Sequence, residues 1–230
     1  MNKISEEYFN AHIFPLWNRY MEIIKSNIDI IDSCVVNNMK ELGYFNSDFS
    51  FNDFNNVLKN LKIEIGFTVP QKADGWFLML SGGFFPHYQN IRNRSAINHS
   101  DKPDFFHDFL GHVPMLIDDD FVNAIRRFSE VYVTQNDYIQ SELMRLWFYI
   151  IEFGVLKNKN RLFIFGGGAI SSDKFSKDFK KGKINIFEFS MSKIRDEKIY
   201  LEGNPENLFY FDSYKKMIST FNKEITCAVR

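Results

Sequence analysis

The decisive stretch of this 230-residue sequence is Pro103-Asp-Phe-Phe-His-Asp-Phe-Leu-Gly-His-Val-Pro114, which contains two of the five histidines, His107 and His112. On a continuous α-helix, a spacing of five residues turns the chain well past one revolution, so the two imidazoles would not share a face. Pro103 favours a helix that begins at the next residue. Gly111 and Pro114 favour the end of that helix. We therefore expect a short helix that ends near Gly111, followed by a bend that lets both rings point to one place.

A carboxylate that could complete a metal site lies in the apolar run 146–156, where Glu152 is the only charge. An ionised carboxylate inside a core costs several kcal/mol unless it is paired or bound to a metal. Two histidines and one carboxylate are typical of non-haem Fe(II), with open positions for oxygen and a co-substrate. Two alternatives are a pair of core histidines and a zinc site, but the i, i+4 histidine spacing of zinc hydrolases is absent. The pattern favours iron held by His107, His112 and Glu152.

These motifs resemble those of the tetrahydropterin-dependent aromatic amino acid hydroxylases. That family carries a Pro-Asp-x-x-His-(Glu or Asp)-x-x-Gly-His-Val-Pro block, then Glu-Phe-Gly, then a Gly-Ala-Gly-(two apolar)-Ser-Ser turn. This chain has Glu152-Phe-Gly and Gly166-Gly-Gly-Ala-Ile-Ser-Ser. The resemblance runs from about Tyr8 to about Phe221 and is strongest to short bacterial phenylalanine hydroxylases. It implies an Fe(II)- and tetrahydropterin-dependent monooxygenase (with tetrahydrobiopterin or a related reduced pterin) that hydroxylates L-phenylalanine to L-tyrosine with O2.

The resemblance also implies roles for residues that would bind the amino acid. Arg92 stands where a family arginine clamps the substrate carboxylate, Asp104 would orient it, and Ser100 stands where a family threonine contacts the same carboxylate. Ser171 would help to hold the substrate and support a ligating histidine. The alternative for Arg92 is a solvated arginine in a basic loop. For the glycine-rich stretch 166–172, a tight turn between packed elements is the plainer alternative, and a phosphate loop is a weak one because the motif lacks a lysine.

The expected pterin and substrate pockets depart from the family pattern. The stretch 70–77 lacks the family's Gly-Leu pair, and Trp76 stands where a phenylalanine stacks on the pterin. Tryptophan can also stack, but Trp76 could instead belong to the core. Asp108 would contact pterin through water. Phe148 replaces the tryptophan of phenylalanine and tyrosine hydroxylases and matches tryptophan hydroxylases, so tryptophan is an open alternative substrate. The altered pterin stretch also leaves open a non-catalytic relative that binds metal or pterin.

Length and composition fit one catalytic domain over residues 1–230. The formal net charge of −1 gives no reason to expect nucleic acid or an anionic membrane as a partner. No run approaches the ~18 apolar residues of a membrane span. Cys34 and Cys227 form no disulfide framework, and the N-terminus does not read as a signal peptide, which predicts a cytoplasmic protein. Without a regulatory domain before the catalytic part or a heptad-rich tail after it, a monomer is expected.

Hydrophobic periodicity predicts an α+β fold that is mostly helical. A polar, basic stretch is expected at 172–183 and an extended segment at 84–91. Helices are predicted over residues 5–25, 27–42, 51–61, 73–80, 118–134, 137–156 and 213–221. Short strands are predicted over 63–70, 161–165, 187–191 and 209–211.

Overall fold

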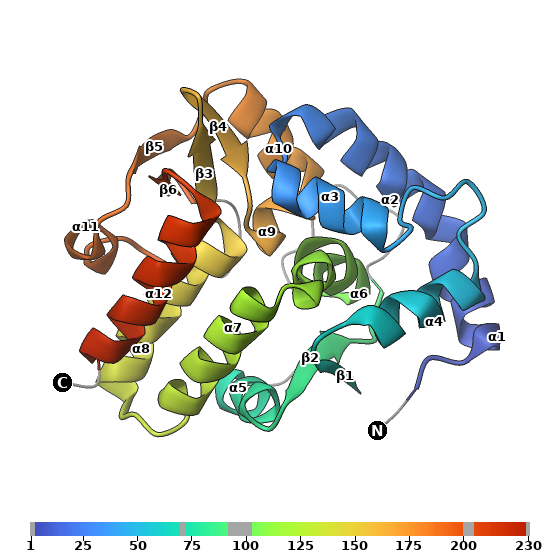
Figure 1. The fold of residues 1–230 in the computed structure, drawn as a ribbon, viewed down its shortest axis with the longest axis horizontal. Coiled ribbons are helices and arrows are strands. Elements are labelled where there is room, and N and C mark those ends of the chain that lie inside the picture. The colour runs from blue at the N-terminus through green and yellow to red at the C-terminus, as the bar shows by residue number, and fades with distance from the viewer. Residues whose placement is uncertain (1–2, 70–71, 92–102, 200–204, 229–230) are drawn as a thin grey trace.

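The computed structural model describes residues 3–69, 72–91, 103–199 and 205–228 (Figure 1). It confirms a mostly helical α+β fold with a few short strands. The helical elements, in which η marks a π or 3-10 turn, are α1 (Glu6–Tyr8), η1 (Phe9–Ile13), α2 (Phe14–Asn27), η2 (Ile28–Ile30), α3 (Ser33–Glu41), α4 (Phe51–Asn60), α5 (Ala73–Ser81), α6 (Phe105–His107), η4 (Asp108–His112), η5 (Val113–Ile117), α7 (Asp119–Tyr132), α8 (Asp137–Trp147), η6 (Phe148–Glu152), α9 (Gly167–Ile170), α10 (Asp173–Lys180), α11 (Met191–Arg195) and α12 (Tyr214–Ala228).

The strands form two small sheets. In the first, β1 (Glu64–Thr68) pairs in parallel with β2 (Phe84–Tyr88), and α5 connects them. The second has the order β4-β3-β6-β5. Its strands are β3 (Val155–Asn158), β4 (Arg161–Ile164), β5 (Asn185–Glu188) and β6 (Asn207–Phe211). The β3–β4 hairpin is closed by Lys159 and Asn160, whose φ angles of 45° and 64° match a two-residue turn with both central residues left-handed.

Side-chain caps fix where several helices begin. Asp32 accepts a hydrogen bond from the Cys34 amide at 2.9 Å at the start of α3. Ser50 and Asp53 form a reciprocal capping box at α4. Asp118 accepts from an amide in the first turn of α7 at 2.8 Å. Each of these side chains satisfies an amide that has no partner within its helix.

The stretch from α6 to η5 lies at the centre of the molecule (Figure 1). It runs between the N-terminal helices α2 to α4 on one side and the group of α7, α8 and α12 on the other. The order of the chain therefore places the histidine motif where segments distant in sequence meet.

A long-range hydrogen bond holds η4 to the N-terminal half. In η4 the amide of Val113 donates to the Asp108 carbonyl, five residues back. The next carbonyl, Phe109, would need the amide of Pro114, which has none. The buried Tyr44 hydroxyl donates to the Phe109 carbonyl instead, at 2.7 Å, and the rings of Tyr44 and Phe109 stack at 5.2 Å. The π turn is therefore completed by a residue 65 positions earlier in the chain.

The polar, basic stretch 172–183, for which no helix or strand was predicted, contains the helix α10, because Ser172 caps it and Phe175 packs into the core. Some predicted boundaries are wrong. The strand predicted over 187–191 ends at Glu188, and Met191 begins α11. The helix predicted over 137–156 ends at Glu152, since β3 begins at Val155. Both cysteines are free, and no described helix is long and apolar enough to cross a membrane.

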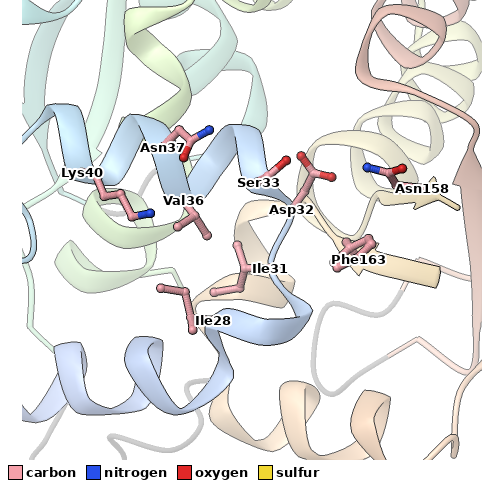
Figure 2. A pocket seen from close by; sticks show the side chains of 9 residues that line it. All are labelled: Ile28, Ile31, Asp32, Ser33, Val36, Asn37, Lys40, Asn158 and Phe163. Atoms are coloured by element: carbon pink, nitrogen blue, oxygen red, sulfur yellow. The ribbon is translucent and has the colours of Figure 1, made fainter.

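A surface cavity of about 290 Å³ lies among η2, α3 and the β3–β4 hairpin (Figure 2). Its walls are largely apolar, including Ile31, Val36 and Phe163, and Asp32 and Lys40 contribute polar groups. The histidine motif does not line this cavity. The candidate chemistry is therefore located elsewhere in the fold.

Candidate active site

His107, His112 and Glu152 converge in the centre of the fold. The two Nε2 atoms are 3.2 Å apart, and Glu152 Oε2 lies 3.5 Å from His107 Nε2 and 3.3 Å from His112 Nε2. Metal bonds of about 2.1 Å at right angles would separate neighbouring donors by about 3 Å. The three atoms could therefore hold one ion, and two imidazoles with one carboxylate are the donor set that suits Fe(II).

A π turn, η4, brings the two histidines together. Its hydrogen bonds run from an amide to the carbonyl five residues back, as in the bond from Val113 to Asp108. Residues five apart then lie on one face, which an α-helix would not allow. The predicted helix end at Gly111 is wrong, because Gly111 lies inside η4 and the helical path continues to His112. The expected convergence of the two rings results from a wider turn rather than from a bend.

A second π turn, η6, positions the carboxylate. The Phe153 amide donates to the Phe148 carbonyl at 3.0 Å. By the same geometry, Trp147 and Glu152 face one another, and the Trp147 indole N–H donates to Glu152 Oε1 at 3.0 Å. No role for Trp147 was predicted from the sequence. Trp147 and Glu152 are five residues apart, as the two histidines are, and this repeated spacing is the sequence signal that could have indicated a role.

The glycine-rich turn fits closely against both π turns. A Cβ on Gly167 would lie 2.4 Å from the His112 ring, and one on Gly166 would lie 2.2 Å from the Glu152 carbonyl. A Cβ on Gly111 would lie 2.4 Å from the Gly167 carbonyl. Real Cβ atoms do not approach other atoms so closely. The glycines therefore allow the start of α9 to pack directly against the residues that carry two of the three candidate ligands.

Hydrogen bonds fix the orientation of the first histidine. His107 Nδ1 is 3.1 Å from Ser171 Oγ, and Ser171 Oγ is 3.4 Å from the Gly168 carbonyl. If Nδ1 carries the proton and donates it to Ser171, Nε2 is left unprotonated toward Glu152 and a metal. Asp104 caps α6 by accepting from the His107 amide at 2.9 Å. Ser171 and Asp104 thus contact the side chain and the backbone of one candidate ligand.

The triad is electrostatically matched. Burial alone would raise the pKa of Glu152, but the neighbouring His112 and His107 outweigh it and lower that pKa to about 2. Burial alone would lower the pKa of His112, but Glu152 beside it raises that pKa above its usual value. The carboxylate is therefore ionised, and a divalent cation can take the place of the proton that His112 would carry.

Asp108 and His87 form a buried polar pair behind the triad. The Asp108 carboxylate accepts from the Tyr88 amide at 2.6 Å, and burial raises its pKa well above the usual value. His87 is fully buried, its Nδ1 lies 2.9 Å from the Tyr88 carbonyl, and burial lowers its pKa to about 3. Asp108 therefore joins β2 to η4, and its water-mediated contact with pterin stays a prediction.

Trp76, predicted to stack on pterin, is half-buried in α5. It makes edge-to-face contacts with Phe85 at 5.5 Å and Trp147 at 5.4 Å, and Phe85 in turn lies 5.9 Å from the His112 ring. Trp76 is thus part of an aromatic cluster that reaches the triad. Trp76 is partly exposed, and its stacking on pterin stays a prediction.

The other predicted substrate residues divide into two groups. Phe148 begins η6, is nearly buried, and packs on Tyr149 at 5.0 Å and Phe153 at 4.8 Å. Arg92 and Ser100 lie outside the described residues. The roles of all three stay predictions from the sequence.

Together, the fold and the triad define a mostly helical α+β protein in which two histidines and one carboxylate form a candidate metal site. Comparison with known families identifies it further: the model for biopterin-dependent aromatic amino acid hydroxylases matches residues 36–227. The chain belongs to that family.

Three known proteins illustrate the similarity. A phenylalanine-4-hydroxylase from Caulobacter vibrioides is 33% identical over 126 residues, which cover 52% of this chain and 43% of that one. The apo phenylalanine hydroxylase of Colwellia psychrerythraea has a TM-score of 0.82 at 21% identity, covering 100% of this chain and 89% of that one. The Chromobacterium violaceum phenylalanine hydroxylase with iron(III) and 7,8-dihydrobiopterin has a TM-score of 0.73 at 20% identity, with coverages of 91% and 80%. Matches to four bacterial phenylalanine-4-hydroxylases span 34% to 58% of those proteins' length.

Proposed function

We propose that this chain is an Fe(II)- and tetrahydropterin-dependent monooxygenase that hydroxylates L-phenylalanine to L-tyrosine with O2. The observation that carries the proposal is the convergence of two imidazole nitrogens and one ionised carboxylate oxygen within 3.5 Å of one another. Three protein ligands leave other positions on the ion open for oxygen and a co-substrate. The bacterial relatives named as phenylalanine-4-hydroxylases support phenylalanine as the substrate.

In this proposal the cofactors supply the activation of O2, and the protein supplies binding, orientation and exclusion of water. His107, His112 and Glu152 hold the iron, and Ser171 keeps the His107 ring in the required tautomer. Trp76 and Asp108 serve the pterin. His112 is buried and the other two triad residues are partly buried, which limits the access of water to the site.

The proposal assigns these functions to one catalytic domain with an aromatic amino acid, O2 and a reduced pterin as its small-molecule partners. Cytoplasmic location, a monomeric state and the lack of a nucleic-acid partner are predictions from the sequence. Iron and biopterin are present in a solved relative, which supports the choice of cofactors.

Product analysis tests the activity. The purified protein is supplied with L-phenylalanine or L-tryptophan, Fe(II), tetrahydropterin and O2, and each component is omitted in turn. Tyrosine is expected from phenylalanine only when all components are present. Binding of iron or pterin without a hydroxylated product from either amino acid would support the non-catalytic alternative, which the altered stretch before Trp76 motivates.

Arg92 is predicted to bind the carboxylate of the amino acid. Arg92→Ala should raise the KM for the amino acid by orders of magnitude, because cutting one partner of a desolvated charge pair costs ~2–5 kcal/mol. Iron content should stay normal, since Arg92 is not a ligand. Arg94→Ala, two residues further on, is the matched control. If the KM is unchanged in Arg92→Ala and rises in Arg94→Ala, the assignment is off by two residues.

Tryptophan is the second candidate substrate, and Phe148 is the observation that favours it. A tryptophan at this nearly buried position would fill volume that phenylalanine leaves free for an indole. Such a change in pocket volume shifts preference by ~1–3 kcal/mol. Phe148→Trp should therefore depress tryptophan turnover more than phenylalanine turnover. The measurement is kcat/KM for both amino acids in both proteins.

The size of the change decides the Phe148 assignment. A ratio that moves by less than about twofold, well under the ~10-fold that corresponds to 1.4 kcal/mol, would show that Phe148 does not line the ring pocket. If the unmodified protein prefers tryptophan outright, the pocket assignment holds and the choice of phenylalanine is the error.

A further inference from the structure

The two oxygens of the Glu152 carboxylate have different partners. Oε1 accepts the indole N–H of Trp147 at 3.0 Å. Oε2 lies 3.3 Å and 3.5 Å from the Nε2 atoms of His112 and His107. Partial rotation of the carboxylate about its last bond would break the indole contact. The hydrogen bond therefore fixes the rotation of the carboxylate, so that one oxygen faces the indole and the other faces the two imidazoles.

The indole is itself firmly held. Trp147 is 5% exposed, and its ring packs edge-on against Trp76 at 5.4 Å and Phe77 at 5.1 Å, both from α5. Phe128 from α7 packs on it at 5.2 Å. Packing on two helices fixes the direction in which the N–H points. The orientation of Glu152 is thus set by elements that do not carry any of the three candidate ligands.

The chemistry of an indole suits this task. Trp147 offers one donor and no acceptor, so it cannot compete with Glu152 for a metal. It is also neutral, and it therefore leaves the full charge of Glu152 available to a cation. A lysine or arginine in its place would orient the carboxylate but would neutralise it as well.

We infer that Trp147 is a positioning residue for the metal centre: its N–H occupies Glu152 Oε1, so that Glu152 presents Oε2 alone to the metal. The inference rests on the proposed function, because it requires a metal at the triad. It adds a contact outside the three ligands that determines how one of them binds.

Substitution of the indole tests the inference, with Co(II) as a visible probe. Trp147→Phe keeps an aromatic ring but removes the donor, which frees Oε1 to reach the metal as well. Loss of a group that orients a ligand typically lowers metal affinity about 10- to 100-fold. We expect a loss of this size for Co(II), together with an altered Co(II) absorption spectrum. Unchanged affinity and an unchanged spectrum would overturn the inference.

Trp17→Phe is the matched control. Trp17 is equally buried, stacks on Phe49 at 3.9 Å and contacts Phe109 of η4 at 5.8 Å, but it does not contact the triad. The same chemical change there should leave the affinity and the spectrum as in the unmodified protein. An equal loss of affinity in both variants would attribute the effect to packing and would count against a positioning role.

If Trp147→Phe does not fold, the inference can still be tested on protein that retains Trp147. The chain has three tryptophans, so its proton–nitrogen NMR spectrum contains three indole signals, which Trp17→Phe and Trp76→Phe assign by elimination. Diamagnetic Zn(II) should shift the Trp147 signal and leave that of Trp17 in place. A Trp147 signal that does not move while Zn(II) binds would overturn the inference alone. If the unmodified protein binds neither Co(II) nor Zn(II), the proposed metal centre fails and the inference with it.

Discussion

Glu152→Gln is expected to leave the protein with little of its iron and almost none of its hydroxylation activity. The amide has one oxygen where the carboxylate has two, and both oxygens of Glu152 are in use. If the amide oxygen accepts from Trp147, its NH2 group faces the imidazoles. If the oxygen faces the metal, the NH2 group opposes the indole N–H. Either orientation also removes the charge that balances the cation.

His107→Ala should have the same result for a different reason, since it removes a neutral ligand together with its contact to Ser171. The measurements are iron per chain after loading with Fe(II) and the rate of tyrosine formation. Glu188→Gln in β5 and His12→Ala near the N-terminus make the same chemical changes at exposed positions and should behave normally. Stoichiometric iron and near-normal turnover in either site variant would show that the triad is assigned wrongly.

Gly167→Ala is expected to weaken both the fold and the metal site. A Cβ at this position would lie 2.4 to 2.8 Å from three atoms of the His112 ring, so the ring must leave Glu152 or α9 must move away from η4. Overpacking of this kind costs ~1–3 kcal/mol. The Tm of the metal-free protein should fall, and iron affinity should fall by about 10-fold or more.

Gly82→Ala provides the comparison for Gly167→Ala. At the end of α5 its Cβ would approach no atom closer than 3.3 Å, and its φ of −74° suits an alanine. Thermal unfolding and an Fe(II) titration of the two variants measure both effects. Equal behaviour of the two variants would mean that the glycine turn does not position His112.

The identity of the candidate ligands could be predicted from the sequence because each depended on residue chemistry. Glu152 is the only charge in an apolar run, and His107 and His112 are bracketed by helix-boundary residues. The backbone that joins them could not be predicted in the same way. Over a few residues, an α-helix and a π turn have the same pattern of hydrophobic residues. Which of the two forms depends on tertiary contacts such as the hydrogen bond from Tyr44 to Phe109.

The role of Gly111 shows the same limit of local patterns. A glycine before a proline is locally the pattern of a helix end. The position of Gly111 in the fold is instead set by the backbone of Gly167, which is distant in the sequence and leaves no space for a side chain. No role for Trp147 was predicted, because an aromatic residue in an apolar run is usually part of a core. Its spacing of five from Glu152 brings the two side chains together in a π turn, but not in the α-helix that the sequence favours there.

The most direct test of the proposed monooxygenase activity is the fate of oxygen. The Fe(II)-loaded protein is incubated with L-phenylalanine, tetrahydropterin and isotopically labelled O2, and the product is analysed by mass spectrometry. The predicted result is tyrosine that carries one labelled oxygen atom. The Glu152→Gln variant should form no tyrosine. Tyrosine without the label, or the absence of any hydroxylated amino acid from phenylalanine and tryptophan alike, would contradict the proposal.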